Sequence, residues 1–311
     1  MAIQWKRRLA AGLVLAALPL IMTSGSLHFH CEEVRAAQVI KEEKGRYGCL
    51  TWPQNLNAVR SEVEIFKEIP KDLRADAPIA NAIYRNTQVY TNSLMLDMRQ
   101  LQAEKPLFYR VRAYDLDGHP IGPYSQPADV ESALFKTERN APIPHDSYGK
   151  GNGSVLLYPV YAYTGNPNAA SYEIEVTSKY PENLHGFSPS VHRIYAAKTE
   201  LTDLYDDAPR TGTYYWRVRG MDSTGKPVGE WSLPQEIKNP VKHWKVAVYG
   251  DSISHGGGHL SFGPADLAYS YESYLDVPSI NLSQSGDTSE AMVMRFEKDV
   301  LPFSPEYLLI L

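Results

Sequence analysis

Two segments in the middle of the chain alternate apolar and polar residues with a period of two. Phe108–Tyr114 and Tyr214–Met221 each alternate aromatic or aliphatic residues with arginine. Successive side chains of a strand point to opposite faces of a sheet, so each segment predicts a strand with one buried face. Each is followed by a turn that contains glycine, at Asp117-Gly118 and at Thr224-Gly225.

These two strands are parts of an internal repeat. Tyr109–Pro127 aligns with Trp216–Pro234 at an offset of 107 residues, and nine of the 19 positions are identical. Such self-similarity indicates two copies of one module of about 100 residues. Earlier strands are predicted at Leu50–Pro53 and Val63–Ile69 in the first copy, and at Val155–Pro159 and Ser171–Ser178 in the second.

The pattern changes after Pro240. Trp244–Tyr249 is almost continuously apolar, which is typical of a parallel strand that is covered on both faces. Further strands are predicted at Ser279–Leu282 and Tyr307–Leu311, with an amphipathic helix between them at Glu290–Val300, capped by Thr288 or Ser289. The order of strand, loop, helix and strand predicts an α/β segment.

Ser252 belongs to the triplet Gly250-Asp251-Ser252, directly after the first of these apolar strands. A turn at the carboxyl end of a parallel strand is where α/β folds present reactive side chains to a ligand. A serine hydroxyl becomes an effective nucleophile when a neighbouring base removes its proton. Ser252 is therefore a candidate nucleophile.

The late strands of the first copy carry Leu101, Leu107 and Ala113 at a regular spacing of six residues. This pattern resembles the fibronectin type III family over residues 46 to 240. The resemblance implies two all-β sandwiches: module 1 at 46–135 and module 2 at 154–240, with a Gly- and Pro-containing linker at 136–153. Such sandwiches serve both as spacers and as binding modules, so the resemblance implies little about a ligand.

The C-terminal segment resembles the SGNH, or GDSL-type, hydrolase family. The residues that carry this resemblance are Gly250-Asp251-Ser252 after an apolar strand, and Asn281 and Gly286 in a loop that ends Gly-Asp-Thr. The resemblance implies that 243–311 is the N-terminal part of a flavodoxin-like α/β domain that hydrolyses esters. Ser252 would attack the acyl carbon, the backbone amides of Ser252 and Gly286 would donate to the oxyanion, and Asp251 would support the turn.

The sequence departs from the pattern of this family in two ways. Ser283 stands where the family often has glycine. The family's oxyanion asparagine and its Asp-x-x-His, which supplies the general base, are absent from the 311 residues. We therefore expect this chain to be a fragment of a longer enzyme and to be inactive by itself. His255 and His259 are alternative bases, but each follows the nucleophile so closely that the chain would have to fold back.

Composition excludes several classes of function. The chain has 31 basic and 36 acidic side chains and a net charge of −5, which gives no basic field for a nucleic acid. Its only cysteines, Cys31 and Cys49, exclude a disulfide framework. His28, His30 and Cys31 lack a fourth spaced ligand, so we expect no metal, and no motif implies an organic cofactor.

The first 37 residues read as an export signal with an N-terminal segment. Lys6, Arg7 and Arg8 precede the apolar run Leu9–Met22, which is shorter than a bilayer span and gives way to small polar residues. Cleavage near Ser26 or after Ala36-Ala37, or retention as a membrane anchor, stays open. We expect a secreted or cell-envelope protein.

These sequence features predict two alternative functions. The first is an exported serine ester hydrolase (an esterase, lipase or carbohydrate esterase) whose β modules hold it at a cell surface or polymer, with an acylated polysaccharide or a lipid as substrate. The alternative is a non-catalytic surface binding or adhesion protein. Tyr124 and Trp231 occupy equivalent repeat positions and could stack on a sugar ring, but recurrence with the repeat favours a packing role.

Overall fold

The structure is a computed structural model that describes residues 47–311 except 54, 56, 102–105, 131–134, 138, 146–152, 185 and 256–270. The predicted signal peptide, the His28-His30-Cys31 cluster and His259 lie outside the described residues. Within the described part of the chain, no helix combines the length and apolar character that a membrane crossing needs.

Module 1 consists of two antiparallel sheets with apolar side chains between them. Its strands are β1 (Tyr47–Thr51), β2 (Arg60–Phe66), β3 (Tyr84–Val89), β4 (Ser93–Asp97), β5 (Phe108–Tyr114), β6 (Pro120–Ile121), β7 (Ala128–Asp129) and β8 (Phe135–Thr137). One sheet has the order β4-β1-β8, and the other has the order β3-β2-β5-β6 with β7 also paired to β5. The core is formed by Leu50, Ile65, Leu96, Leu101, Leu107 and Val130.

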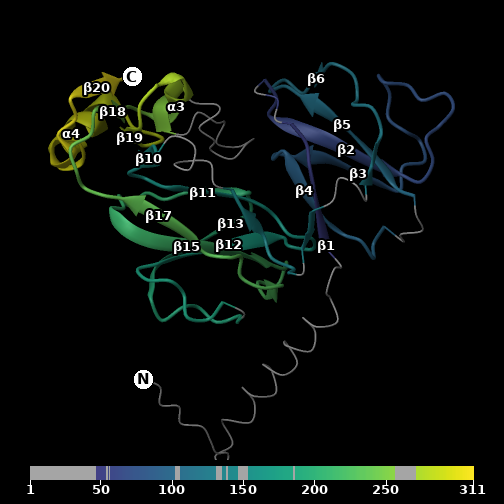
Figure 1. The fold of residues 1–311 in the computed structure, drawn as a ribbon, viewed down its shortest axis with the longest axis horizontal. Coiled ribbons are helices and arrows are strands. Elements are labelled where there is room, and N and C mark those ends of the chain that lie inside the picture. Colours follow the sequence, from purple (N-terminus) through teal and green to yellow (C-terminus); the bar gives the residue numbers. More distant parts are fainter. Residues whose placement is uncertain are drawn as a thin grey trace, which may run out of the picture. The chain divides into compact units, whose positions relative to one another are not determined.

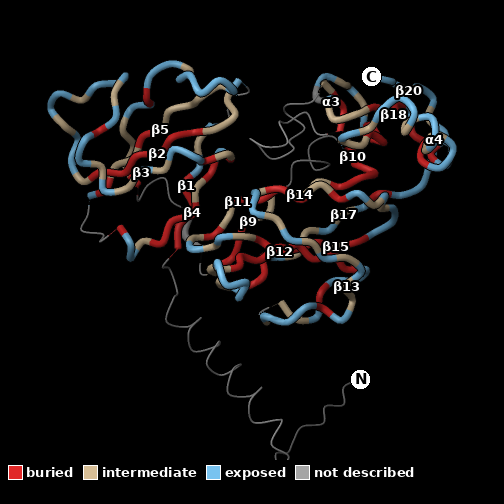
Figure 2. Tube along the Cα trace, turned by 180° about the vertical axis from the view of Figure 1, so that it is seen from behind, coloured by how far each residue is buried: buried red, intermediate tan, exposed pale blue. Residues whose placement is uncertain are grey.

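Module 2 repeats this arrangement. Its strands are β9 (Ile143–Pro144), β11 (Val160–Thr164), β12 (Ser171–Thr177), β13 (Arg193–Thr199), β14 (Asp203–Tyr205), β15 (Gly212–Met221), β16 (Pro227–Val228) and β17 (Gln235–Asn239). The sheet orders are β14-β11-β9 and β13-β12-β15-β16, with β17 paired to β15. Buried residues concentrate on the strands (Figure 2), and the core is rich in aromatic side chains: Tyr161, Tyr163, Tyr172, Tyr214 and Trp216.

The segment predicted as a linker also takes part in these sheets. β9 lies within it and pairs with β11 of module 2, whereas the equivalent position beside β1 of module 1 is occupied by β8. β8 thus follows the other strands of module 1 in the sequence, whereas β9 precedes the other strands of module 2. Side-chain periodicity does not show which strand a short segment pairs with, because the pairing is made by backbone groups.

A third sheet, of four strands, contains the C-terminal residues. It is formed by β10 (Val155–Leu156), β18 (Val246–Tyr249), β19 (Ser279–Asn281) and β20 (Tyr307–Ile310) in the order β10-β19-β18-β20, and all its pairings are parallel (Figure 1). The helix α4 (Ser289–Asp299) connects β19 to the short helix η3 (Leu301–Phe303) and β20. Thr288 is its N-cap, because the Thr288 side chain accepts a hydrogen bond from Ala291 N.

The position of β10 shows that one predicted strand belongs to a different sheet. Val155–Pro159 reads as an early strand of the second sandwich, but Val155 and Leu156 pair with Ile280 and Asn281 in the parallel sheet. A short apolar run satisfies its backbone equally well in either kind of sheet, and its sequence does not distinguish them. Module 2 is therefore joined to the C-terminal segment by backbone hydrogen bonds.

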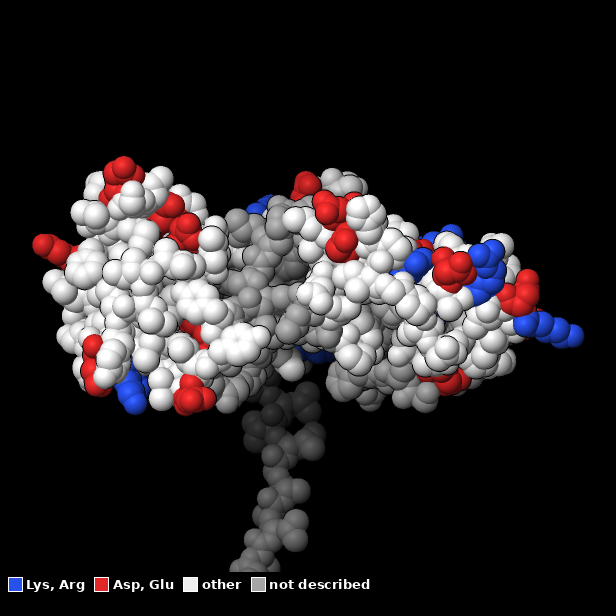
Figure 3. All heavy atoms as spheres, turned by 90° about the horizontal axis from the view of Figure 1, so that it is seen from above, with Lys and Arg blue, Asp and Glu red and all other residues white. Residues whose placement is uncertain are grey.

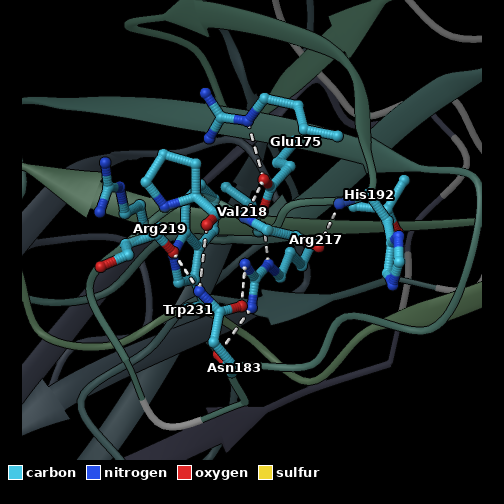
Figure 4. A network of polar contacts seen from close by, with 12 residues as sticks. Glu175, Asn183, His192, Arg217, Val218, Arg219 and Trp231 are labelled. Carbon is cyan, nitrogen blue, oxygen red and sulfur yellow. Dashed lines mark hydrogen bonds and ion pairs between the residues drawn. The ribbon is translucent and has the colours of Figure 1, made fainter.

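The prediction that β5 and β15 each bury only one face is wrong for their central arginines. In module 2, Arg217 has no exposed surface, and its Nε donates to Glu175 Oε2 at 2.6 Å (Figure 4). Glu175 Oε1 accepts from Arg193 Nε and Ser190 N, both at 2.7 Å. Arg217 also donates to Asn183, in the loop that covers this face of the sheet. The buried carboxylate and guanidinium thus satisfy each other.

Module 1 has the same buried ion pair at equivalent positions. Arg110 Nε donates to Glu64 Oε2 at 2.8 Å, and Glu64 Oε1 accepts from Arg85 Nε at 2.9 Å and from Ile79 N at 3.0 Å. Arg110 also donates to the carbonyl oxygen of Ala77 at 2.7 Å. The repeat therefore preserves a charged layer as well as a hydrophobic core.

The recurring aromatic residues belong to this layer. The guanidinium of Arg110 lies 3.9 Å from the ring centroid of Tyr124, and that of Arg217 lies 4.6 Å from the ring of Trp231. Tyr124 is 2% exposed and Trp231 is fully buried. The packing interpretation of these two residues is confirmed, and neither ring is available to a sugar.

Arg217→Met should lower the free energy of unfolding by about 3 kcal/mol, because it leaves Glu175 buried with one of its two arginine partners missing. Urea denaturation measures this loss. Lys238→Met is the matched control, because the ion pair between Lys238 and Glu236 is exposed and its removal should leave the urea midpoint unchanged. Equal midpoints for wild type and Arg217→Met would contradict the prediction.

Candidate active site

Parallel pairing brings two loops to one edge of the C-terminal sheet. β18 and β19 are in register with Val246 opposite Ser279 and Val248 opposite Asn281, so both strands end at the same edge. The loops that follow them touch, because Gln284 N donates to the carbonyl oxygen of Gly250 at 3.1 Å. The two sequence blocks that carry the hydrolase resemblance are therefore neighbours in the structure.

Ser252 begins the short helix α3 (Ser252–His255) and is half-buried. Neither its hydroxyl nor its backbone amide is hydrogen-bonded to another residue of the described chain. Asp251 holds the turn, because its Oδ1 accepts from Ile253 N at 2.9 Å and its carbonyl oxygen accepts from Ser254 N and His255 N. This is the supporting role that the sequence predicts for Asp251.

Glycine is required at position 250 of the same turn. A Cβ at this position would lie 2.6 Å from the carbonyl oxygen of Leu311 and 2.8 Å from Ser254 Oγ. Contacts this short do not occur for real Cβ atoms, so a side chain would displace the backbone beside Ser252. Gly250 thus permits the turn to lie close to Leu311, the residue directly after β20.

Gly286 lies in the second loop and is exposed, with φ of 88°. Residues other than glycine rarely adopt this conformation. Its amide donates no hydrogen bond to a described residue, which leaves it available to a ligand. Ser283, which replaces a glycine of the family pattern, is fully buried, and its Oγ has no hydrogen-bond partner in the described chain.

His255 is a fixed, neutral residue. Its Nδ1 accepts from Ser285 N at 2.8 Å, and its Nε2 lies 2.7 Å from the carbonyl oxygen of Tyr158 and therefore carries the proton. The side chain is 1% exposed, and burial lowers its pKa to about 4. Because both ring nitrogens have partners, His255 does not serve as the general base for Ser252. It instead ties the turn to module 2.

Arg295, on α4, joins the two loops from below. Its Nη1 donates to the carbonyl oxygen of Leu282 at 2.6 Å and its Nη2 to that of Gly250 at 3.3 Å, while its Nε pairs with Asp287. Sequence reasoning missed this residue. The only sequence signal for Arg295 was that it is a basic residue in the middle of a helix that we predicted from its apolar residues.

Asn281 links the end of β19 to α3. Its Nδ2 donates to the carbonyl oxygen of Ser254 at 2.6 Å and to Glu272, and its Oδ1 accepts from Ser283 N at 2.9 Å. Glu272 is fully buried, and this burial raises its pKa to about 7. Asn281 therefore acts as a positioning residue in the structure, beneath the loop that contains Gly286.

A cavity of about 720 Å³ lies at the same edge of the sheet. It is lined by residues of both loops and by α4 and β20, among them Asp251, Asp287, Met292, Phe296 and Ile310. Ser252 itself is not among the lining residues. The walls are largely apolar apart from Ser289 and the acidic residues Asp251, Asp287 and Glu297. A cavity of this size accommodates a small organic group.

Comparisons with known proteins include two solved structures of low similarity. No protein-family model matches the chain, and no curated protein matches it. A β-1,2-glucanase from Parabacteroides distasonis is 11% identical with a TM-score of 0.23, over 64% of this chain and 28% of the glucanase. The fibronectin(III)-like modules of Clostridium thermocellum CbhA are 14% identical with a TM-score of 0.20, over 63% of this chain and 87% of theirs.

The chain thus spans less than a third of the glucanase. Likeness at these TM-scores carries no argument about activity. What the structure establishes is a mostly β chain with two repeated sandwiches and a parallel sheet at which the two loops meet.

His255 should make stability depend on pH. Its pKa is about 4 in the folded chain and 6.5 when unfolded, so between these values only the unfolded chain binds the proton. The stability that neutral His255 contributes is present above pH 6.5 and is lost as the pH falls toward 4. The expected loss is about 3 kcal/mol, measured by urea unfolding at several pH values.

His255→Gln is the matched control, because glutamine offers an acceptor to Ser285 and a donor to Tyr158 without titrating. The difference in unfolding free energy between wild type and variant should shrink from pH 7 to pH 4. Glu272, whose raised pKa acts in the opposite direction, is present in both proteins and cancels from this difference. Parallel pH profiles for the two proteins would show that His255 is not buried and neutral.

Proposed function

We propose that this chain is part of an exported serine ester hydrolase of the SGNH type, in which Ser252 is the nucleophile. The observation that carries the proposal is the contact between the two loops at the carboxyl edge of the sheet. One loop presents Ser252 with no hydrogen-bonded partner in the described chain, and the other presents the amide of Gly286, with Gln284 N bonded to Gly250 O. A serine hydroxyl and an uncommitted backbone donor on two loops that touch suit attack on a carbonyl group.

The reaction would follow the serine-hydrolase course. Ser252 Oγ attacks the acyl carbon of the ester while a base takes its proton, and the carbonyl oxygen becomes an oxyanion. The amides of Ser252 and Gly286 donate to that oxyanion. Collapse releases the alcohol and leaves an acyl-serine ester, which water then hydrolyses to free acid and serine. The family pattern takes the base from an Asp-x-x-His and a further oxyanion donor from an asparagine.

The fibronectin type III-like modules would hold the hydrolase at a cell surface or a polymer, and the predicted signal peptide would export it. Acidic and basic side chains are interspersed among neutral ones on the face drawn in Figure 3, in keeping with the net charge of −5. This distribution favours an uncharged polymer or a lipid ester over a nucleic acid. A non-catalytic binding protein is the competing function.

The polypeptide that continues this chain through the Asp-x-x-His should hydrolyse p-nitrophenyl acetate, whereas the 311-residue chain should not. Ser252→Ala should lower the rate of the longer protein by at least about a thousandfold, because the nucleophile is lost. Release of p-nitrophenol measures both.

Ser304→Ala is the control for this experiment, because Ser304 is an exposed serine of the same segment and touches neither loop. It should hydrolyse at the wild-type rate. A Ser252→Ala variant that retains its rate would remove Ser252 from the mechanism. A longer protein that folds but cleaves no ester would favour the binding function.

A further inference from the structure

Module 1 contains an open groove of about 420 Å³. It lies against the ends of β1, β2 and β5, and its walls include three aromatic side chains, Trp52, Tyr90 and Tyr109. Trp52 and Tyr109 are half-buried, and each also packs against the core of module 1. These two rings are therefore held in place by the core and border the groove.

The groove arises from a difference between the two repeats. Ser61 pairs with Ala113 in module 1, and Tyr172 pairs with Gly220 in module 2, so Ser61 and Tyr172 occupy equivalent positions. The Tyr172 ring is 8% exposed and packs edge-on against Tyr163 with centroids 4.9 Å apart, between the sheets of module 2. Ser61 has no ring at this position, the residue is 7% exposed, and its Oγ accepts from Trp52 Nε1 at 3.2 Å.

A second equivalent pair shows the same difference. Asn55 accepts a backbone hydrogen bond from Ala58, as Asn166 does from Ala169. Asn166 is 4% exposed and its side chain donates to the carbonyl oxygen of Val228. Asn55 is exposed at the rim of the groove. Asn166 and Tyr172 line a separate cavity of about 440 Å³. The two modules therefore differ in the residues that line this end of each sandwich and not in whether it is open.

The polar groups of the groove are mostly amides and hydroxyls, together with Arg60 and with His145 of the 136–153 segment, whose Nε2 lies 2.7 Å from Thr164 Oγ1. The groove lining contains amide and hydroxyl side chains, among them Asn92, Ser125 and Gln126, and contains neither Asp nor Glu. Arg60 is the one arginine, and it is engaged, because its Nη1 donates to the carbonyl oxygen of Thr87 at 2.7 Å and its guanidinium lies 4.1 Å from the ring of Tyr114. A lining of mainly neutral groups without Asp or Glu suits an uncharged ligand.

We propose that this groove of module 1 binds an uncharged glycan chain. The C–H face of a sugar ring packs on a rigid aromatic face, and its hydroxyl groups exchange hydrogen bonds with amides and hydroxyls that both donate and accept. A volume of about 420 Å³ accommodates one or two sugar rings, within the range of small-ligand sites. A proline-rich peptide also uses aromatic grooves, but the amides and hydroxyls on the rim favour the glycan.

Isothermal titration calorimetry of the full chain with cellohexaose, xylohexaose and mannohexaose tests this proposal. At least one hexasaccharide should bind. Trp52→Ala and Tyr90→Ala should each weaken its affinity about tenfold or more, because they remove stacking surface at the centre of the site. Ser61→Tyr, which places the module 2 residue in the groove, should abolish binding while near-ultraviolet circular dichroism shows a folded module.

Tyr180→Ala is the matched control, because Tyr180 is an exposed tyrosine of module 2 that packs on Tyr215. It should bind the glycan as the wild type does. Ser252→Ala should also leave binding unchanged, so that failure of the hydrolase proposal and failure of this one are distinguishable. Absence of binding to all three glycans, unchanged affinity in Trp52→Ala and Tyr90→Ala, or binding of a proline-rich peptide at the same groove instead would overturn the proposal.

Discussion

The candidate site depends on the parallel pairing of β18 with β19. Two parallel neighbours end at the same edge of a sheet, so the loops after Tyr249 and Asn281 meet without any further contact being needed. The bond between Gln284 N and Gly250 O then fixes their separation. Asn281 and Arg295 hold the loops from beneath, and an antiparallel pairing would have placed the two blocks at opposite edges.

Module 2 also contributes a strand to this sheet. β10 extends it beside β19, and His255 donates to the carbonyl oxygen of Tyr158, two residues beyond β10. A buried histidine with both nitrogens bonded cannot also exchange protons with Ser252. His255, the candidate base nearest in sequence to Ser252, is thus committed to joining the turn to module 2.

The two modules share a buried ion-pair layer and differ on their inner faces. Both keep a buried glutamate between two arginines, Glu64 in one and Glu175 in the other, with an aromatic ring over the central guanidinium. Charges that satisfy each other in this way are costly to separate, which fixes the covering loop on the sheet. The inner faces have diverged at one pair of positions, because Tyr172 of module 2 stands where module 1 has Ser61.

The sequence by itself determined the repeat, the strands β5, β15, β18 and β19, and the helix α4, whose cap it narrowed to Thr288 or Ser289. These follow from periodicity and from short-range turn and capping chemistry. Only the tertiary structure decided that Arg110 and Arg217 are buried, that Val155 and Leu156 belong to the parallel sheet, and that His255 is neutral. Burial, strand partners and pKa depend on residues that are distant in the chain, and local pattern carries no record of them.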